Sequence, residues 1–342
     1  MAEQFATSFA TPNYSGLLFN KGNTRTPLSS MIGGKVKITD HCEFVVGQDY
    51  TSNGNGAQPS ISESASLTAP ESSVITRSQN TNITQIFQEA VGVSYAKKSN
   101  MGTLSGLNVS NQQANPISEL DFQVGAKMQK IARDIEYTIV NGVYQKATSD
   151  SEANKTRGLI PAITSNVKAM GSKPLGLWDI ADMMKKIYEA NAPTVGLFLW
   201  CDATTMFQVN ADAVQNGLTI VPNALDVNGI RLSKVLTPIG EVYLRIGECL
   251  PKGTALLFNF DVLYHVVQEV PGKGNFFLEE LAKTGAGEKY QIFGQHGLDY
   301  GPEWYHGKFT GISQKFEAPT YSRSVYVANA ADFNKTAGDE TA

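Results

Sequence analysis

The fold is decided by residues 116–145, PISELDFQVGAKMQKIARDIEYTIVNGVYQ, which predict a single long helix. Asn115 is a favoured N-cap residue, and Pro116 suits the first helical position. Apolar side chains recur at spacings of three and four, at Ile117, Leu120, Val124, Met128, Ile131, Ile135, Ile139 and Val143. The polar side is expected to carry Lys127, Lys130, Arg133, Asp134 and Glu136. At 1.5 Å per residue the helix would be about 45 Å long, so it would be a spine for the molecule.

A long polar stretch, 51–88, precedes this helix. Ser, Thr, Asn and Gln fill more than half of its positions, and its only charged residues are Glu63, Glu71 and Arg77. Runs typical of strands flank it at 35–46 and 82–93, and a turn-forming cluster lies at 51–56. We expect a two-stranded arm that leaves the main body and needs a partner surface, because an isolated hairpin is at best marginally stable. A disordered Ser/Thr-rich linker is the alternative.

After the long helix, helical and strand-like segments alternate. Amphipathic helices are expected at 177–188 and, with Asp202 as cap, at 202–207. Strands are expected in the apolar run 195–200, in the alternating run 241–246 and in the apolar stretch 254–267. Because the alternation has no strict β-α-β rhythm, the sequence favours an α+β fold over a doubly wound sheet.

Composition excludes several classes of protein. The chain has 342 residues and a net charge of −4, so it has no chain-wide basic footprint for nucleic acid. Cys42, Cys201 and Cys249 are odd in number and far apart, which favours a reducing compartment over a disulfide framework. The sequence shows no signal peptide and no membrane-spanning run, so we expect a soluble protein folded in a cytoplasm.

No motif for catalysis, cofactor or metal binding stands out. The segment 301–308, GPEWYHGK, differs from a phosphate-binding loop in its glycine spacing and in the Phe that follows its lysine. His41 adjoins Cys42 without further ligands at metal-site spacing. His296 and His306 flank a turn-rich segment and could meet across a hairpin, where structural hydrogen bonding is the favoured role. A Cys–His pair stays open, because such partners meet only in space.

Four separated motifs, some followed by shorter matching segments, resemble in their order those of one known family. They are NTRTPLSSMIG at 23–33, KIARDIEY at 130–137, RGL at 157–159, LAKTG at 281–285, EKYQI at 288–292, HGL at 296–298 and HGK at 306–308. On these residues the chain resembles the major capsid proteins of tailed bacteriophages with the Hong Kong 97-type fold, and within them the SU-ten subgroup. The likeness extends from about residue 20 to 315.

The resemblance implies an L-shaped α+β subunit with several parts. They are an N-terminal arm (1–34), an extended loop (35–100), a peripheral domain with the spine helix (101–164), an axial domain (165–275), a return to the peripheral domain (276–327) and a C-terminal tail (328–342). The arm and the loop would reach neighbouring subunits, and the axial domain would cluster round five- and six-fold axes. Identical chains that each reach several others can close into a shell.

The resemblance also implies a structural protein and no enzyme. The chain would be a major capsid protein that self-assembles, as hexamers and pentamers, into an icosahedral head shell around double-stranded DNA. DNA would be enclosed without sequence-specific binding, and no cofactor, metal or membrane is expected. A portal protein, with scaffolding or decoration proteins, would be further partners, and the expected location is the virion capsid, assembled in the host cytoplasm. A scaffold would be separate or unnecessary, because no coiled-coil-like segment is seen at the N-terminus, and no motif marks a Lys–Asn cross-link.

Two other functions stay open at this point. An encapsulin-type nanocompartment shell with the same fold would enclose protein cargo. A soluble enzyme would need a constellation of residues such as His296, His306 and Cys201.

Contacts between subunits are expected at ten residues. They are Arg25, Leu28, Met31, Ile32, Glu63, Glu71, Arg77, Lys283, Glu288 and Lys289. Arg25 and the three apolar residues should anchor the arm, and the charges of the loop are candidates for salt bridges between subunits.

Overall fold

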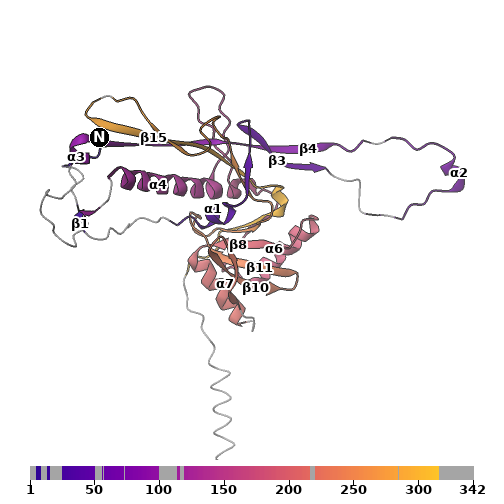
Figure 1. The fold of residues 1–342 in the computed structure, drawn as a ribbon. Helices are drawn as coiled ribbons and strands as arrows, with labels where there is room; N and C mark the ends of the chain where they lie inside the picture. Colours follow the sequence, from indigo (N-terminus) through magenta and orange to yellow (C-terminus); the bar gives the residue numbers. More distant parts are fainter. Residues whose placement is uncertain are drawn as a thin grey trace, which may run out of the picture.

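The computed structural model describes residues 5–8, 14–15, 25–50, 56, 58–72, 74–99, 114–115, 119–215, 220–283 and 285–315. Figure 1 shows an upper body with a long helix and long strands, a lower body with two further helices, and a hairpin that projects to one side. The start of the predicted spine helix, most of the turn cluster at 51–56 and the tail at 328–342 lie outside the described residues.

Helix α4, Glu119–Asn141, is the predicted spine. It ends four residues before the predicted end, because Gly142 is pressed against the returning chain. A Cβ at Gly142 would lie 2.5 Å from the carbonyl oxygen of Thr156. Only the second half of α4 is buried, at Ile131, Ile135, Glu136, Thr138, Ile139 and Val140. The predicted stripe is therefore wrong at Met128 and Val143, which are exposed, and Glu136 is not on the polar side.

A five-stranded sheet forms the upper body with α4. Its order is β14 (Phe277–Glu280), β15 (Gly287–Asp299), β13 (Tyr264–Val267) and β2 (Val36–Ile38), with β5 (Gln85–Ser94) also paired to β15. Strands β5 and β15 pair antiparallel over ten registered positions. Figure 1 shows α4 lying along these long strands, and α4 contacts β5 directly.

A seven-stranded sheet forms the lower body. Its order is β7 (Val167–Ala169), β16 (Gly307–Thr310), β12 (Ala255–Asn259), β8 (Leu197–Cys201), β11 (Gly240–Ile246), β10 (Ile230–Thr237) and β9 (Val221–Val227). Helices α6 (Leu177–Glu189) and α7 (Ala203–Gln215) belong to the same body. The predicted cap of α7 is confirmed, because Asp202 Oδ1 accepts the backbone N–H of Thr205 at 2.9 Å.

Strand β8 explains why an apolar run without alternation can be a strand. All five of its side chains are buried. Leu197, Leu199 and Cys201 face the core that includes α6 and α7, whereas Phe198 and Trp200 face the core shared with α1 and α4. A sheet that is covered on both faces needs apolar residues at every position.

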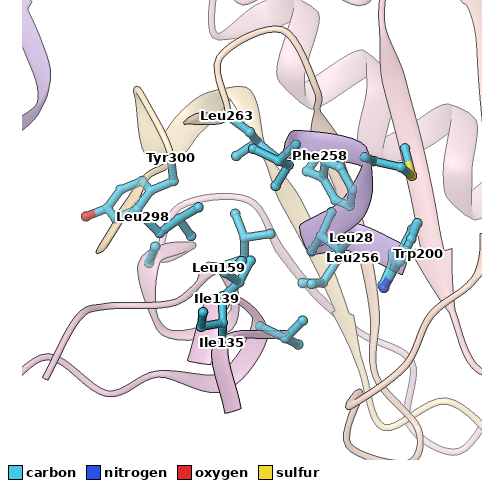
Figure 2. Packing of buried hydrophobic residues seen from close by; sticks show 14 of the residues in the cluster. Leu28, Ile135, Ile139, Leu159, Trp200, Leu256, Phe258, Leu263, Leu298 and Tyr300 are labelled. Atoms are coloured by element: carbon cyan, nitrogen blue, oxygen red, sulfur yellow. The ribbon is translucent and has the colours of Figure 1, made fainter. Parts of the chain in front are cut away.

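The core that Phe198 and Trp200 face also includes the N-terminal segment at α1 (Pro27–Ile32). Figure 2 shows Leu28 beside Leu256, Phe258 and Trp200, so α1 packs on the seven-stranded sheet. The same core continues through α4 to Leu298 and Tyr300 of the upper body. One apolar core therefore joins the two bodies, and α1 lies where they meet.

The projecting hairpin, defined here as residues 43–83, consists of β3 (Glu43–Tyr50), α2 (Glu63–Ser66) and β4 (Arg77–Ile83). Strands β3 and β4 form a two-stranded sheet of their own. The projection is shorter than the loop expected at 35–100, because β2 and β5 are held in the five-stranded sheet. The remaining elements are short: β1 (Tyr14–Ser15), β6 (Ala114–Asn115), α3 (Tyr95–Ser99), α5 (Leu159–Ala162) and the 3-10 helix η1 (Glu303–Tyr305).

The axial domain was expected to end near residue 275. In the structure the chain passes between the two bodies at other positions. The apolar stretch 254–267 is two strands, β12 in one sheet and β13 in the other. A turn divides them, in which Asn259 Oδ1 accepts the N–H of Asp261 at 2.9 Å. Strand β16 then returns to the seven-stranded sheet between β7 and β12.

Candidate assembly surfaces

The tip of the projecting hairpin exposes apolar side chains that its own subunit leaves uncovered. The exposed fractions are 86% for Leu67, 85% for Val74 and 73% for Ile61. Figure 1 shows this tip far from both bodies. Glu63, Glu71 and Arg77 are exposed on the same hairpin, and none forms an ion pair with another described residue. Because a group of exposed apolar side chains marks a contact site, the tip is a candidate for binding another molecule.

The base of the hairpin is firmly held by Asn82, which is fully buried. Its Nδ2 donates to the carbonyl oxygen of Leu298 at 2.8 Å and to that of Arg157 at 3.1 Å, and its Oδ1 accepts the N–H of Arg157 at 2.8 Å. Arg157 and Leu298 belong to the RGL and HGL motifs of the sequence. These motifs therefore fix the direction in which the hairpin leaves the body.

Glycine of the RGL motif permits a very close approach of two backbones. A Cβ at Gly158 would lie 2.5 Å from the carbonyl oxygen of Thr138 in α4. The N–H of Gly158 donates to the carbonyl oxygen of Gly142 at 2.7 Å. Any larger residue would push this segment away from the end of α4.

The apolar residues of the N-terminal motif pack inside their own subunit. Leu28, Met31 and Ile32 are at most 1% exposed. They anchor α1 to the core, as the sequence suggested, and the same chain covers them. Contact of these three side chains with a neighbouring subunit stays a prediction.

Glu136 of α4 binds the first turn of α1. Its Oε1 accepts the N–H of Leu28 at 3.1 Å, and its Oε2 accepts the N–H of Ser29 at 2.7 Å. Burial raises the pKa of Glu136 to about 7, although the two N–H groups and Arg133 oppose that shift. A carboxyl group with this pKa changes its charge near neutral pH.

A pair of buried histidines, His265 and His296, also contacts α1, through His265. His265 Nε2 lies 3.0 Å from the carbonyl oxygen of Ser29, and its Nδ1 lies 2.5 Å from Nε2 of His296. A carbonyl oxygen only accepts, so Nε2 of His265 carries a hydrogen and Nδ1 of the neutral ring accepts from His296. Burial lowers the pKa of both rings, most strongly that of His296.

Two further residues complete the binding of this segment. Asn228 Nδ2 donates to the carbonyl oxygens of Met31 at 2.9 Å and of Ser30 at 3.2 Å, at the end of α1. Arg133 donates to the carbonyl oxygen of Arg25 at 3.1 Å. We call α1 with Glu136, His265, Asn228 and Arg133 the arm junction. It joins the N-terminal motif to α4, to the five-stranded sheet and to the seven-stranded sheet.

Sequence analysis missed most of the arm junction. Glu136 and Arg133 lie in the KIARDIEY motif and were predicted to be polar surface, whereas His265 and Asn228 carried no motif. Their partners are about 100 to 240 residues away in the chain. The sequence offered one signal for this contact, which is that the arm motif (23–33) and the helix motif (130–137) occur in the same chain.

Lys283, Glu288 and Lys289 have partners within their own subunit. Glu288 accepts from Lys98 at 2.9 Å, and the ammonium group of Lys289 lies 4.9 Å above the ring of Phe5. Lys283 pairs with a carboxylate three residues earlier at 3.4 Å. Arg25 lies 3.6 Å from Glu248 and is 81% exposed. A role of these residues between subunits stays a prediction.

Two grooves lie on the surface. The first, of about 570 Å³, runs between β5 and α4, and exposed Ile86, Tyr137 and Val143 line it. The second, of about 520 Å³, lies between α1 and the end of the β10–β11 pair and contains three arginines. Both are open surface features of the two bodies.

His296 and His306, which could have met across a hairpin, do not meet, and each forms the structural hydrogen bonds that were the favoured role. His306 is buried elsewhere, where Nδ1 accepts the N–H of Asn259 at 3.2 Å and Nε2 donates to the carbonyl oxygen of Tyr300 at 2.6 Å. Burial lowers the pKa of His306 to about 4 and raises that of the buried Cys201 thiol well above its usual range. These side chains are structural, so the constellation considered for an enzyme does not form.

Within the described ranges, no three His, Cys, Asp or Glu side chains are grouped so as to hold a metal ion. The same part of the chain contains no helix that is long and apolar enough to cross a membrane.

The arrangement of two bodies, spine helix and projecting hairpin is that of the Hong Kong 97-type fold of shell proteins. The capsid chain of cyanophage A-1(L) has a TM-score of 0.58 and 11% identity, covering 92% of this chain and 98% of its own. The SrpI encapsulin of Synechococcus elongatus has a TM-score of 0.58 and 10% identity, covering 90% and 96%. A chain from Mycobacterium phage Bobi has a TM-score of 0.55 and 12% identity, covering 90% and 97%. At these identities the likeness shows the fold alone.

The sequence separates the phage proteins from the encapsulins within this fold. The SU10 major capsid protein family matches residues 1–313. The chain therefore belongs to that family, the subgroup expected from the motifs, and is a major capsid protein that forms a head shell in the virion. No curated protein matches the chain at a significant level.

Proposed function

We propose that copies of this chain form hexamers and pentamers, which close into an icosahedral head shell around double-stranded DNA. The exposed apolar tip of the projecting hairpin carries the proposal. Three large apolar side chains held in water far from the body would be costly for a monomer, whereas a neighbouring subunit would cover them.

The first groove is the site that fits this tip best. Ile86, Tyr137 and Val143 are each more than half exposed along it. An apolar tip on one subunit and the exposed apolar side chains of this otherwise polar groove on another would form a heterologous contact, which generates rings when the rotation closes. The tip would therefore lie on α4 and β5 of the next subunit.

The expected domains follow from the two bodies. We assign the seven-stranded sheet with α6 and α7 to the axial domain, and the five-stranded sheet with α4 to the peripheral domain. The axial domain would then consist of residues 165–259 and 307–313. The projecting hairpin and residues 1–34 would be the parts that reach neighbouring subunits.

The remaining expectations belong to the same proposal. The shell would assemble in the host cytoplasm, without catalytic activity, and would enclose DNA without reading its sequence. A portal protein would occupy one vertex, and scaffolding or decoration proteins would bind the shell.

Substitutions at the tip test the proposal. Leu67→Ser with Val74→Ser should leave a folded subunit, because neither side chain packs on its own chain, but should abolish closed shells in negative-stain electron microscopy. Lys185→Gln, which removes an exposed charge from α6, is the control and should assemble normally. Deletion of residues 51–66 should act like the double substitution. Normal yields of closed particles from the tip variants would refute the proposed role of the hairpin.

The contents of the shells separate the two shell functions. Particles purified from infected cells should protect double-stranded DNA from nuclease. Particles that instead enclose one enriched host protein and no DNA would favour the encapsulin alternative, whose fold is equally similar.

A further inference from the structure

The second groove gathers positive charge in a chain whose net charge is −4. Arg25, Arg231 and Arg245 line it, and Glu248 is its one acidic lining residue. The guanidinium group of a fourth arginine, Arg133, lies 3.1 Å from the carbonyl oxygen of Arg25. A concave surface with one sign of charge concentrates ions of the opposite sign. We call the set Arg25, Arg231, Arg245 and Glu248 the arginine groove.

Two of the three lining arginines have described contacts that place their guanidinium groups. Arg25 lies 3.6 Å from Glu248, on a side chain that is largely in solvent. Arg245 donates to the carbonyl oxygen of Arg231 at 2.7 Å, which fixes its guanidinium group at the start of β10. Among the described residues, the lining of the groove therefore contains three guanidinium groups and one carboxylate.

Arg245 also has a buried donor without an acceptor. Its Nε is buried and has no hydrogen-bond partner among the described residues. Trp200, the register neighbour of Arg245 across the β8–β11 pair, has an Nε1 in the same condition. Trp200 is fully buried in the apolar core and does not line the groove, whereas Arg245 does. Buried N–H groups are almost always satisfied in folded proteins, so the Nε of Arg245 indicates that an acceptor is missing there.

We propose that the arginine groove binds the phosphate groups of nucleic acid. Guanidinium groups bind phosphate through paired N–H donors, and arginine keeps its charge at all relevant pH values. A groove of about 520 Å³ is larger than one inorganic anion needs, and three arginines around it suit successive phosphates of one strand. The proposal rests on the proposed enclosure of DNA, which supplies the ligand.

Salt dependence of DNA binding tests the groove. The full chain is titrated onto a short labelled duplex over a range of salt, and fluorescence anisotropy gives the slope of log K against log salt. That slope is negative, and each lost phosphate contact reduces its magnitude by about 0.9. Arg231→Gln with Arg245→Gln should therefore lower it by about 1.8, and Arg25→Gln, an exposed site that cannot disturb the core, by about 0.9. Lys185→Gln with Lys186→Gln removes the same charge from α6 and should change it little.

Three results would overturn the proposal. If the groove variants and the Lys185/Lys186 control variant reduced the slope equally, the protein would attract DNA through its general charge and not through the groove. An unchanged slope in Arg25→Gln and in the double variant would mean that the groove does not bind DNA. Displacement of DNA by polyglutamate as well as by a phosphate polymer of equal charge would favour an acidic protein segment as the occupant.

Electron microscopy of the same samples keeps the two proposals apart. If the wild-type chain binds DNA through the groove but forms no shells with its neighbouring phage proteins, the proposed function fails and the groove stands. If shells form normally and the slopes agree for all variants, only the groove proposal fails.

Discussion

The arm junction and the projecting hairpin use apolar and charged groups in opposite ways. At the junction, Leu28 is fully buried and even the carboxylate of Glu136 is enclosed, with two N–H donors and an arginine around it. On the hairpin, Leu67 is almost fully exposed, and Glu63, Glu71 and Arg77 have no ion pairs within the described structure. The junction holds one subunit together, whereas the hairpin leaves its interactions to another. Stability of the subunit and formation of the shell should therefore be separable by mutation.

The same substitution at two positions, Leu28→Ala and Leu67→Ala, should give the largest difference in the stability of the subunit. Leu28→Ala removes a fully buried side chain and should lower the free energy of unfolding by about 2–5 kcal/mol. Leu67→Ala should change it by less than about 0.5 kcal/mol, yet reduce the yield of shells. Urea denaturation of the unassembled subunit measures the first effect, and sedimentation of particles measures the second. If Leu67→Ala destabilised the isolated subunit as Leu28→Ala does, the comparison would be wrong.

The pH dependence of stability should identify Glu136 as a buried acid. Its pKa is raised from 4.5 to about 7, so the folded state binds a proton more readily than the unfolded state between those values. Stability from this group is complete below about pH 4.5 and is lost as the pH rises through 7, by about 3 kcal/mol in total. Glu136→Gln should remove this alkaline loss, as measured by urea denaturation between about pH 6 and 8.5.

The buried histidines supply the control for that experiment. Burial lowers the pKa of His265 and His296 below 6.5, so their contribution to stability is complete above about pH 6.5 and is lost as the pH falls from 6.5 through the lowered pKa values. In Glu136→Gln the free energy of unfolding should still fall toward acid pH, but it should no longer fall toward alkaline pH. An alkaline decline that persists in Glu136→Gln would assign it to another group.

Asn228 tests the other end of α1 with a smaller effect. Its backbone φ is +49°, in the region that favours glycine, and its side chain donates twice to α1. Asn228→Gly keeps the turn and removes only the hydrogen bonds, at about 1–2 kcal/mol. Asn228→Ala adds the strain of the left-handed backbone and should cost about 1 kcal/mol more. Equal stability of both variants and the wild type in thermal denaturation would show that the side chain does not hold the arm.

The smallest effect is expected at the base of the hairpin. Lys146 donates to Glu43 at 2.6 Å, and this bond holds the pKa of Glu43 below its usual value, but both groups are exposed. Exposed ion pairs add little to stability, so Lys146→Ala should leave the thermal unfolding midpoint unchanged. A fall as large as that of Asn228→Gly would mean that the surface pair, in addition to buried Asn82, fixes the hairpin.

Local patterns explain which parts of the fold were predictable. The spacing of Ile131, Ile135 and Ile139 identified the spine, and the unbroken apolar run of β8 identified a strand covered on both faces. Asp202 was a correct cap because capping depends on the next few residues.

Long-range contacts explain the rest. Glu136 has the sequence context of a surface residue and becomes buried only because α1 lies over it. The stretch 254–267 has the composition of one strand, and its division depends on which sheet each half meets. Motif order identified the family, whereas the grooves depend on elements that meet only in the folded chain.

The position of Leu28 has a consequence for synthesis on the ribosome. This residue, close to the start of the chain, packs on Leu256 and Phe258, and strand β16 closes the same sheet only at residues 307–310. Contacts with such sequence separation form slowly and late. Nascent chains shorter than about 310 residues should therefore stay sensitive to protease in the arm segment, and protection at a much shorter length would contradict this. Subunits would become competent to associate only after β16 has left the ribosome, which guards against premature polymerisation on polysomes.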